Sequence, residues 1–377
     1  MQFSRIKLEN WRNFSQVDVA LQTRVFLVGA NASGKSNFLD VFRFLRDLVM
    51  PGGGFQEAIA KRGGVSIIRN LAARHPNTDI AIEVEFPEGV ETTWRYRIML
   101  NQDNHRRPVL KGEKIWLNDE LLLDRPDPQD RADKARLSQT LLEQTFVNRE
   151  FRKIAEVFRS INYVHVIPQL VRDPEHSNRQ AIDSHGSDLI EQMASVRKEV
   201  QETRLRRTLQ AIRIAVPQLS ALELVRDDQG DPHLRAKFEG GQRQGSWQTE
   251  NLFSDGTVRL IGLLWALQDG NGPLLIEEPE LSLHPGVVRR LPQIIRHVQR
   301  EMKGSPRQIL ISTHSSELLS DVGIAPDEIL LFSVSSEGSQ IRSGASFPAV
   351  LQELDAGLTM ADIVLPRTEP PDVRQLA

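Results

Sequence analysis

The chain has 377 residues, a formal charge of -3 and no cysteine. This length fits one large α/β domain with an insertion, or two domains, and the 40% of hydrophobic residues allows a substantial core. The lack of cysteine excludes disulfides, thiolate zinc sites and cysteine nucleophiles. The nearly balanced charge excludes a global attraction for nucleic acid, so a DNA contact would have to be a local patch. No apolar run has the length of a signal peptide or a membrane span, and we expect a cytoplasmic, soluble protein.

Residues 1–118 predict the N-terminal half of an α/β domain followed by a β-rich lobe. Apolar runs predict strands over residues 3–8 and 25–28, and a wide apolar face predicts a helix from Ser36 to the glycine-rich turn at Pro51. Short polar connections favour antiparallel pairing of the strands that follow. These strands are expected over residues 80–86, 93–100 and 114–118.

Residues 119–250 predict an inserted, mainly helical subdomain. A strand over 161–166 and a polar loop over 172–187 interrupt it, and the apolar positions of 189–212 predict one amphipathic helix, too short for a long coiled coil. Residues 251–377 return to α/β alternation. In this part we expect strands over 273–276, 308–312 and 328–333, and helices over 258–267, over 286–302 and near Ser315.

Residues 29–36, Gly-Ala-Asn-Ala-Ser-Gly-Lys-Ser, match the phosphate-binding loop pattern G-x-x-x-x-G-K-[ST] between an apolar strand and a helix. Glycines let the backbone turn its N–H groups inward, and the helix N-terminus adds positive potential. We therefore predict that this loop binds the phosphates of a nucleotide, with Lys35 neutralising their charge and Ser36 ligating Mg²⁺. The residues assigned to nucleotide binding here are Gly29, Asn31, Ser33, Gly34, Lys35, Ser36 and Asn37.

An apolar strand that ends in carboxylates, Pro-Leu-Leu-Ile-Glu-Glu-Pro-Glu over residues 273–280, predicts the catalytic edge of a parallel sheet. On this interpretation Glu277 supports Mg²⁺ and Glu278 polarises the attacking water. In isolation such a sequence is more often a solvated turn after a core strand. The presence of the phosphate loop in the same chain favours the catalytic role.

Three more polar segments lie around this strand. Phe-Ser-Asp-Gly-Thr at 253–257 precedes an apolar helix and predicts an N-cap that binds phosphate. Leu-Ser-Leu-His follows at 281–284, and Ser-Thr-His-Ser follows the next strand at 312–315. A lone histidine after a strand is usually a cap or a surface group, so a role for His314 depends on the motifs in series with it.

This order of motifs resembles, over nearly the whole chain, the ABC-type ATPase heads of the SMC, RecF and OLD-like group, whose bacterial members are often called AAA-family ATPases. The resemblance implies an α/β P-loop NTPase fold with an antiparallel β lobe and an inserted helical subdomain, and ATP and Mg²⁺ as cofactors. It also implies a homodimer that sandwiches nucleotide, in which Ser254 and Gly256 of one subunit cap the γ-phosphate bound by the other. The family roles carried over are catalytic for Glu278, His314 and Lys35, metal-binding for Ser36, Glu277 and Gln169, and nucleotide-proximal for Arg12 and Asn13.

Three features depart from the family pattern. Glu277 stands where many relatives have Asp, and Asp255 stands where transporter-type relatives have Gly. The segment after His314 is short for the TOPRIM nuclease domain that is fused to OLD-type proteins, so we assign no nuclease to this chain.

The resemblance implies a role in DNA repair or anti-phage defence, with ATP gating a separate effector such as a TOPRIM-type nuclease. The alternative is a regulatory module that controls a partner protein or toxin without touching DNA. Stimulation of ATP hydrolysis by DNA would separate the two, and direct DNA contact stays open. A transporter motor is disfavoured because the sequence encodes no membrane segment.

Two other groups of polar residues are interpreted as structural. The histidines have no compact ligand spacing and no accompanying cysteine, and the arginines lie on a loop and a helix face that water solvates more often than a phosphate does. These residues are His165, His176, His185, Arg106, Arg107, Arg204, Arg206 and Arg207.

Overall fold

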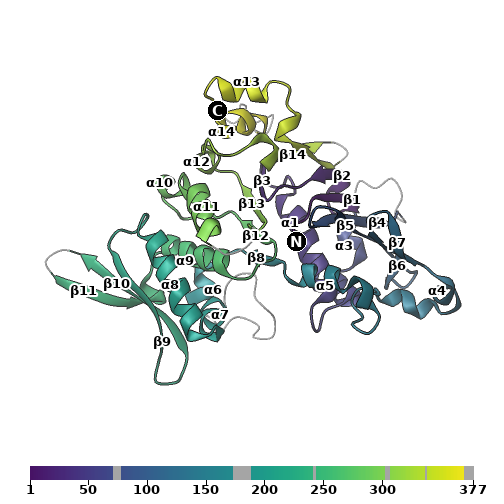
Figure 1. The fold of residues 1–377 in the computed structure, drawn as a ribbon, viewed down its shortest axis with the longest axis horizontal. Coiled ribbons are helices and arrows are strands. Elements are labelled where there is room, and N and C mark those ends of the chain that lie inside the picture. Colours follow the sequence, from purple (N-terminus) through teal and green to yellow (C-terminus); the bar gives the residue numbers. More distant parts are fainter. Residues whose placement is uncertain (71–77, 173–187, 241–242, 302–305, 336–337, 369–377) are drawn as a thin grey trace.

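The computed structural model describes residues 1–70, 78–172, 188–240, 243–301, 306–335 and 338–368. These residues form three sheets (Figure 1). A mainly parallel sheet lies in the centre of the view, an antiparallel β lobe at right and a three-stranded sheet at lower left. Every helix in this part of the chain is too short or too polar to cross a membrane.

The central sheet has the order β15-β14-β3-β13-β12-β8, and only its edge strand β15 runs antiparallel. The strands are β3 (Arg24–Gly29), β8 (Asn162–Val164), β12 (Leu274–Glu277), β13 (Ile309–Thr313), β14 (Ile329–Ser335) and β15 (Gly338–Ser343). Alternate residues enter two separate cores, with Leu275 and Leu310 in one and Ile276 and Ile311 in the other. Burial on both faces explains why the central strands β3, β12 and β13 are mainly apolar. All the strands predicted for this sheet are confirmed.

Helices cover both faces of the central sheet. α1 (Lys35–Val49) and α5 (Arg152–Arg159) contribute to the core on the side of the β lobe. α9 (Asp255–Gln268) and α11 (Leu291–Glu301) contribute to the core on the other side. The single helix predicted over 286–302 is two helices, because the chain bends after α10 (Pro285–Val288) before α11 begins.

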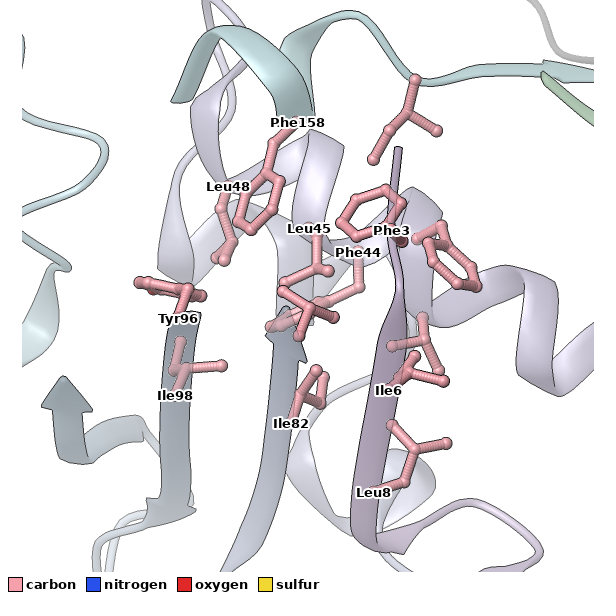
Figure 2. Close-up of a cluster of buried hydrophobic side chains, with 14 of the residues drawn as sticks. Phe3, Ile6, Leu8, Phe44, Leu45, Leu48, Ile82, Tyr96, Ile98 and Phe158 are labelled. Carbon is pink, nitrogen blue, oxygen red and sulfur yellow. The ribbon is translucent and has the colours of Figure 1, made fainter. Parts of the chain in front are cut away.

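The β lobe is one antiparallel sheet in the order β2-β1-β4-β5-β6-β7. Its strands are β1 (Arg5–Trp11), β2 (Phe14–Ala20), β4 (Ile80–Glu88), β5 (Thr92–Gln102), β6 (Pro108–Leu117) and β7 (Glu120–Arg125). The predicted antiparallel pairing is confirmed, whereas β2 and β7 were not predicted. Figure 2 shows how α1 is packed on this sheet, with Phe44, Leu45 and Leu48 next to Ile82 and Tyr96. The helix that follows the phosphate-binding loop is thus clamped between two sheets.

The described residues of the segment 119–250 form strands as well as helices and are not mainly helical. Its strand β7 pairs with β6 and so belongs to the β lobe, and α5 packs on α1. The helix predicted over 189–212 is broken at Val196 and Arg197, where the backbone becomes extended between two shorter helices. These are α7 (Leu189–Ser195) and α8 (Lys198–Ile212), and they are followed by β9 (Leu219–Arg226), β10 (Pro232–Gly240) and β11 (Arg243–Thr249).

Strands β9, β10 and β11 form the third sheet, whose buried face packs on α7 and α8. Apolar residues alternate with polar ones along β10, and bulges near its end shift its pairing with both neighbours. The division of the chain at residues 118 and 250 stays a prediction. The remaining helices are α2 (Phe55–Ala60), α3 (Val65–Ile68), α4 (Pro128–Ala132), α6 (Pro168–Arg172), α12 (Ser316–Leu319), α13 (Val350–Asp355) and α14 (Met360–Val364). Short 3₁₀ turns lie at Lys134–Ser138, Asn148–Phe151, Glu250–Leu252, Pro326–Glu328, Gly344–Ser346 and Leu365–Arg367.

Candidate functional site

The phosphate-binding loop joins the end of β3 to the start of α1. Gly34 has a φ of 105°, and a Cβ atom there would lie 2.2 Å from Nδ2 of Asn13. At Gly29 a Cβ atom would lie 2.7 Å from the carbonyl oxygen of Phe332 on β14. Both positions therefore require glycine, and the loop has the strand–turn–helix setting that the sequence predicts.

Lys35 bends back over this loop. Its Nζ donates hydrogen bonds to the carbonyl oxygens of Gly29, at 2.7 Å, and Ala30, at 3.0 Å. Burial lowers the pKa of Lys35, and the nearby Glu278 and Glu280 carboxylates oppose that change. The ammonium group therefore lies at the loop with carboxylates as its nearest charged groups.

Glu277 is bound through both of its carboxylate oxygens. Oε1 accepts a hydrogen bond from the Ser36 hydroxyl at the start of α1, and Oε2 accepts one from the Tyr163 hydroxyl on β8. Tyr163 is adjacent because β8 pairs in parallel with β12 and places it opposite Leu275. A hydroxyl and a carboxylate are the oxygen ligands that Mg²⁺ prefers, so Ser36 and Glu277 fit the predicted metal site.

Glu278 lies directly after the end of β12 in an unusual backbone conformation, with a φ of 44°. Its N–H donates to the carbonyl oxygen of Ser312 on the neighbouring strand, at 3.1 Å. Its Oε1 lies 3.6 Å from Nδ1 of His314, which follows β13. The structure therefore brings Glu278, the predicted water-activating acid, and His314, which is also predicted to be catalytic, to the same edge of the sheet.

Glu280 also belongs to this cluster, although the sequence analysis gave it no role. It is 8% exposed, and its Oε1 accepts hydrogen bonds from the Thr313 hydroxyl, at 2.7 Å, and the His314 N–H, at 3.1 Å. Its carboxylate thus fixes the backbone that carries His314.

The segment around Ser254 and Gly256 forms the N-terminus of α9. Ser254 is the N-cap, with its Oγ 3.3 Å from the Thr257 amide nitrogen. A Cβ atom on Gly256 would lie 2.5 Å from the carbonyl oxygen of Ser282, so the segment packs tightly on the loop at 281–284. Across the described residues, no hydrogen bond or ion pair joins Ser254 or Gly256 to the loop at 29–36 of the same chain.

Arg172 at the end of α6 holds this segment in place. Its Nη2 donates to the carbonyl oxygen of Phe253, at 2.6 Å, and lies 2.7 Å from Oδ1 of Asp255. The acid that departs from the transporter-type pattern is therefore paired with an arginine of the same chain.

The other predicted nucleotide and metal residues have mixed positions. Asn13 contacts the loop, with its Nδ2 3.3 Å from the Ser33 carbonyl oxygen and its Oδ1 accepting from Asn37 Nδ2 at 2.8 Å. Arg12 instead pairs with Asp40 on α1, at 2.7 Å.

Asn31 is exposed on the loop, whereas Ser33 is buried. Gln169 is exposed on α6, and the side chain that contacts the predicted metal ligand is Tyr163. Tyr163 carried no sequence signal, because a tyrosine in an apolar strand is usually a core residue.

The residues interpreted as structural do not form a second site among those described. Nδ1 of His165 lies 3.5 Å from the Glu277 carbonyl oxygen, while His176 and His185 lie outside the described residues. Arg107 pairs with Asp103, and Arg204 pairs with Asp269. Within the described ranges, no group of three or more potential ligand side chains is arranged to hold a metal ion.

The fold is similar to that of solved SMC heads. An SMC head bound to the C-winged helix domain of ScpA superposes with a TM-score of 0.55 at 15% identity, over 91% of this chain and 97% of that one. An SMC head with an extended coiled coil, from Pyrococcus furiosus and bound to the C-terminal domain of ScpA, gives 0.53 at 14% identity, over 94% and 99% of the two chains. Identities this low establish the fold alone.

Sequence comparison gives one family and one short local match. Endonuclease GajA of Bacillus cereus (strain VD045) is 40% identical over 58 residues, which are 15% of this chain and 10% of that protein. The chain thus spans about a tenth of this curated relative. The family described as "AAA domain, putative AbiEii toxin, Type IV TA system" matches residues 24–320, which hold the phosphate loop, the acidic pair and His314. The chain therefore belongs to this AAA-domain family, and it has the P-loop NTPase fold of the solved SMC heads.

Proposed function

We propose that the chain binds Mg·ATP at the C-terminal edge of the central sheet and hydrolyses it to ADP and phosphate. The observation that carries this proposal is the convergence of Lys35, Ser36 and the acidic pair at that edge, from elements far apart in the sequence. Acids at the ends of parallel strands next to a phosphate-binding loop are the arrangement that phosphoryl transfer requires.

Each residue has a distinct role in this proposal. The loop N–H groups and Lys35 bind the β- and γ-phosphates, while Ser36 and Glu277 hold Mg²⁺. The metal ion, when bound, neutralises charge on the phosphates. Glu278 accepts a proton from the attacking water, and His314, 3.6 Å from its carboxylate, orients that water and the γ-phosphate.

We propose further that two copies sandwich two nucleotides. A phosphate held only by the loop at 29–36 stays open to water on its far side, and among the described residues no hydrogen bond or ion pair joins Ser254 or Gly256 to that loop in the same chain. The N-terminus of α9 in a second copy would supply the missing donors. ATP binding would then drive association, and hydrolysis would release it.

Two variants test this proposal. Lys35→Ala should abolish ATP binding in calorimetric titrations. Glu278→Gln should keep binding, slow phosphate release by ~10²–10⁴-fold as expected for loss of a general base, and accumulate an ATP-bound dimer in light scattering. A Glu278→Gln chain that hydrolyses ATP at the native rate would refute the role of Glu278.

We propose that the ATPase cycle controls a separate effector in genome defence or repair. The local similarity to an endonuclease and the toxin named in the family description support an effector of this kind. The alternative is a module that regulates a partner without contacting DNA. Phosphate release measured with and without duplex DNA distinguishes them, because stimulation is expected only where DNA reaches the ATPase.

A further inference from the structure

Tyr163 belongs to a chain of contacts that ends at the metal site. Its hydroxyl donates to Oε2 of Glu277, while Ser36 donates to Oε1 of the same carboxylate. Tyr163 is 6% exposed. A phenol is protonated at neutral pH, so Tyr163 serves as a donor to this carboxylate.

The ring of Tyr163 is itself held from the other side. The guanidinium carbon of Arg43 lies 4.4 Å from the ring centroid, within the range of a cation–π contact. Arg43 lies on α1, two turns after Ser36. The same helix therefore carries both the first and the last residue of the series Ser36, Glu277, Tyr163 and Arg43. Since α1 also carries Lys35, a shift of Tyr163 would be transmitted through this helix to the phosphate-binding loop.

A glutamate needs such support more than a shorter acid does. Its side chain has three rotatable bonds and loses more rotamer entropy when it is fixed than the shorter side chain of aspartate does. The bond from Ser36 fixes one oxygen and leaves the carboxylate free to rotate about it. The bond from Tyr163 fixes the second oxygen and thereby the plane of the carboxylate.

We propose that Tyr163 is a positioning residue that sets the orientation of Glu277 and thereby the strength and selectivity of Mg²⁺ binding in the nucleotide complex. This inference rests on the proposed function, because it concerns the metal that accompanies ATP. Partners that orient a metal ligand typically contribute ~10–100-fold to metal affinity. The expected effect is thus a shift in Mg²⁺ dependence rather than a loss of the fold.

The test is Tyr163→Phe, which removes the hydroxyl and keeps the ring. Binding of a non-hydrolysable ATP analogue is measured by calorimetry in EDTA and across a Mg²⁺ titration. We expect unchanged affinity in EDTA and a Mg²⁺ midpoint raised by about 10-fold or more. An unchanged midpoint, or an equal loss of affinity in EDTA, would overturn the inference.

Tyr96→Phe is the matched control. Tyr96 is the other of the two tyrosines in the chain and is buried in the β lobe. Its hydroxyl likewise lies within hydrogen-bond distance of a glutamate, Glu113, at 3.3 Å. Removing the Tyr96 hydroxyl should leave the Mg²⁺ midpoint unchanged. A midpoint that rises as much as in Tyr163→Phe would show a general effect of losing a buried hydroxyl.

Glu277→Gln provides the second comparison. If Tyr163 acts through Glu277, adding Tyr163→Phe to Glu277→Gln should raise the Mg²⁺ midpoint by less than it does in the native chain. Additive effects would contradict the inference. A native chain that fails to bind the analogue under every condition would instead refute the proposed function, so the two failures are distinguishable.

Discussion

Glu280 shows how much of the site depends on a residue that touches no substrate. Its buried carboxylate accepts hydrogen bonds from the Thr313 hydroxyl and the His314 N–H. These two bonds connect the loop after β12 to the end of β13. Its Oε2 has no hydrogen-bond partner among the described residues. Its negative charge nevertheless opposes the lowering of the Lys35 pKa by burial. The position of His314 therefore depends on a neighbouring carboxylate.

We predict that Glu280→Ala lowers the free energy of unfolding by about 1–3 kcal/mol, because it leaves a buried hydroxyl and an N–H unpaired. ATP hydrolysis should fall by ~10–100-fold through the displacement of His314, with ATP affinity retained at Lys35. Denaturant unfolding, calorimetry and phosphate release measure the three quantities. Glu317→Ala, which removes a carboxylate bound only by nearby serine hydroxyls and its own turn, serves as the control.

Tyr163 and Glu280 also show why the sequence predicts one part of the site and not another. The phosphate loop and the acidic pair are each a continuous stretch of sequence, so the residue types and their spacing within each stretch predict its chemistry. Tyr163 and Glu280 act through partners on other strands, and those pairings follow from sheet order, which no local pattern encodes. Gln169 was chosen by its place in the order of motifs, and on α6 its side chain is exposed.

At the scale of elements, strands buried on both faces and the helix α1 follow from apolar runs and breakers. The short β8 lies within the strand that was predicted over residues 161–166. Strands β2 and β7 were missed because each is half-exposed and follows a tight turn after a partner strand. The break between α7 and α8 was missed because the apolar spacing continues through it.

The contact between α9 and the loop after β12 gives a prediction at this scale. Gly256→Ala would place a Cβ atom 2.5 Å from the Ser282 carbonyl oxygen, a backbone atom that has to move. The strain of such overpacking is ~1–3 kcal/mol and should tilt the N-terminus of α9. We expect ATP binding by the monomer to persist while ATP-dependent dimerisation and hydrolysis are lost.

Gly286→Ala is the matched control for this prediction. Its Cβ atom would lie 3.3 Å from Nδ1 of His284, so a side chain and not the backbone has to adjust. Dimerisation measured by light scattering with ATP should be normal in this variant. A Gly256→Ala chain that dimerises as well as Gly286→Ala would show that the packing of α9 on the loop has no part in association.

At the scale of the whole molecule, the Ser254 segment and the phosphate loop begin helices that pack on opposite faces of the central sheet. Ser254 starts α9, which joins the core shared with α8 and α11, whereas the loop starts α1, which joins the core of the β lobe. If each nucleotide needs one element from each copy, two differently damaged copies can repair one site between them.

We therefore predict that Lys35→Ala and Ser254→Ala chains, each inactive alone, regain hydrolysis when mixed. If the chains paired at random at equal concentrations, half of the dimers would hold one chain of each kind and one intact site each, so hydrolysis of up to about a quarter of the native rate is expected. Phosphate release across mixing ratios measures it. In the control, a chain that carries both changes replaces the Ser254→Ala chain, and no pairing with Lys35→Ala then leaves an intact phosphate loop. Hydrolysis in this control mixture would contradict the shared site. So would the absence of hydrolysis in the first mixture.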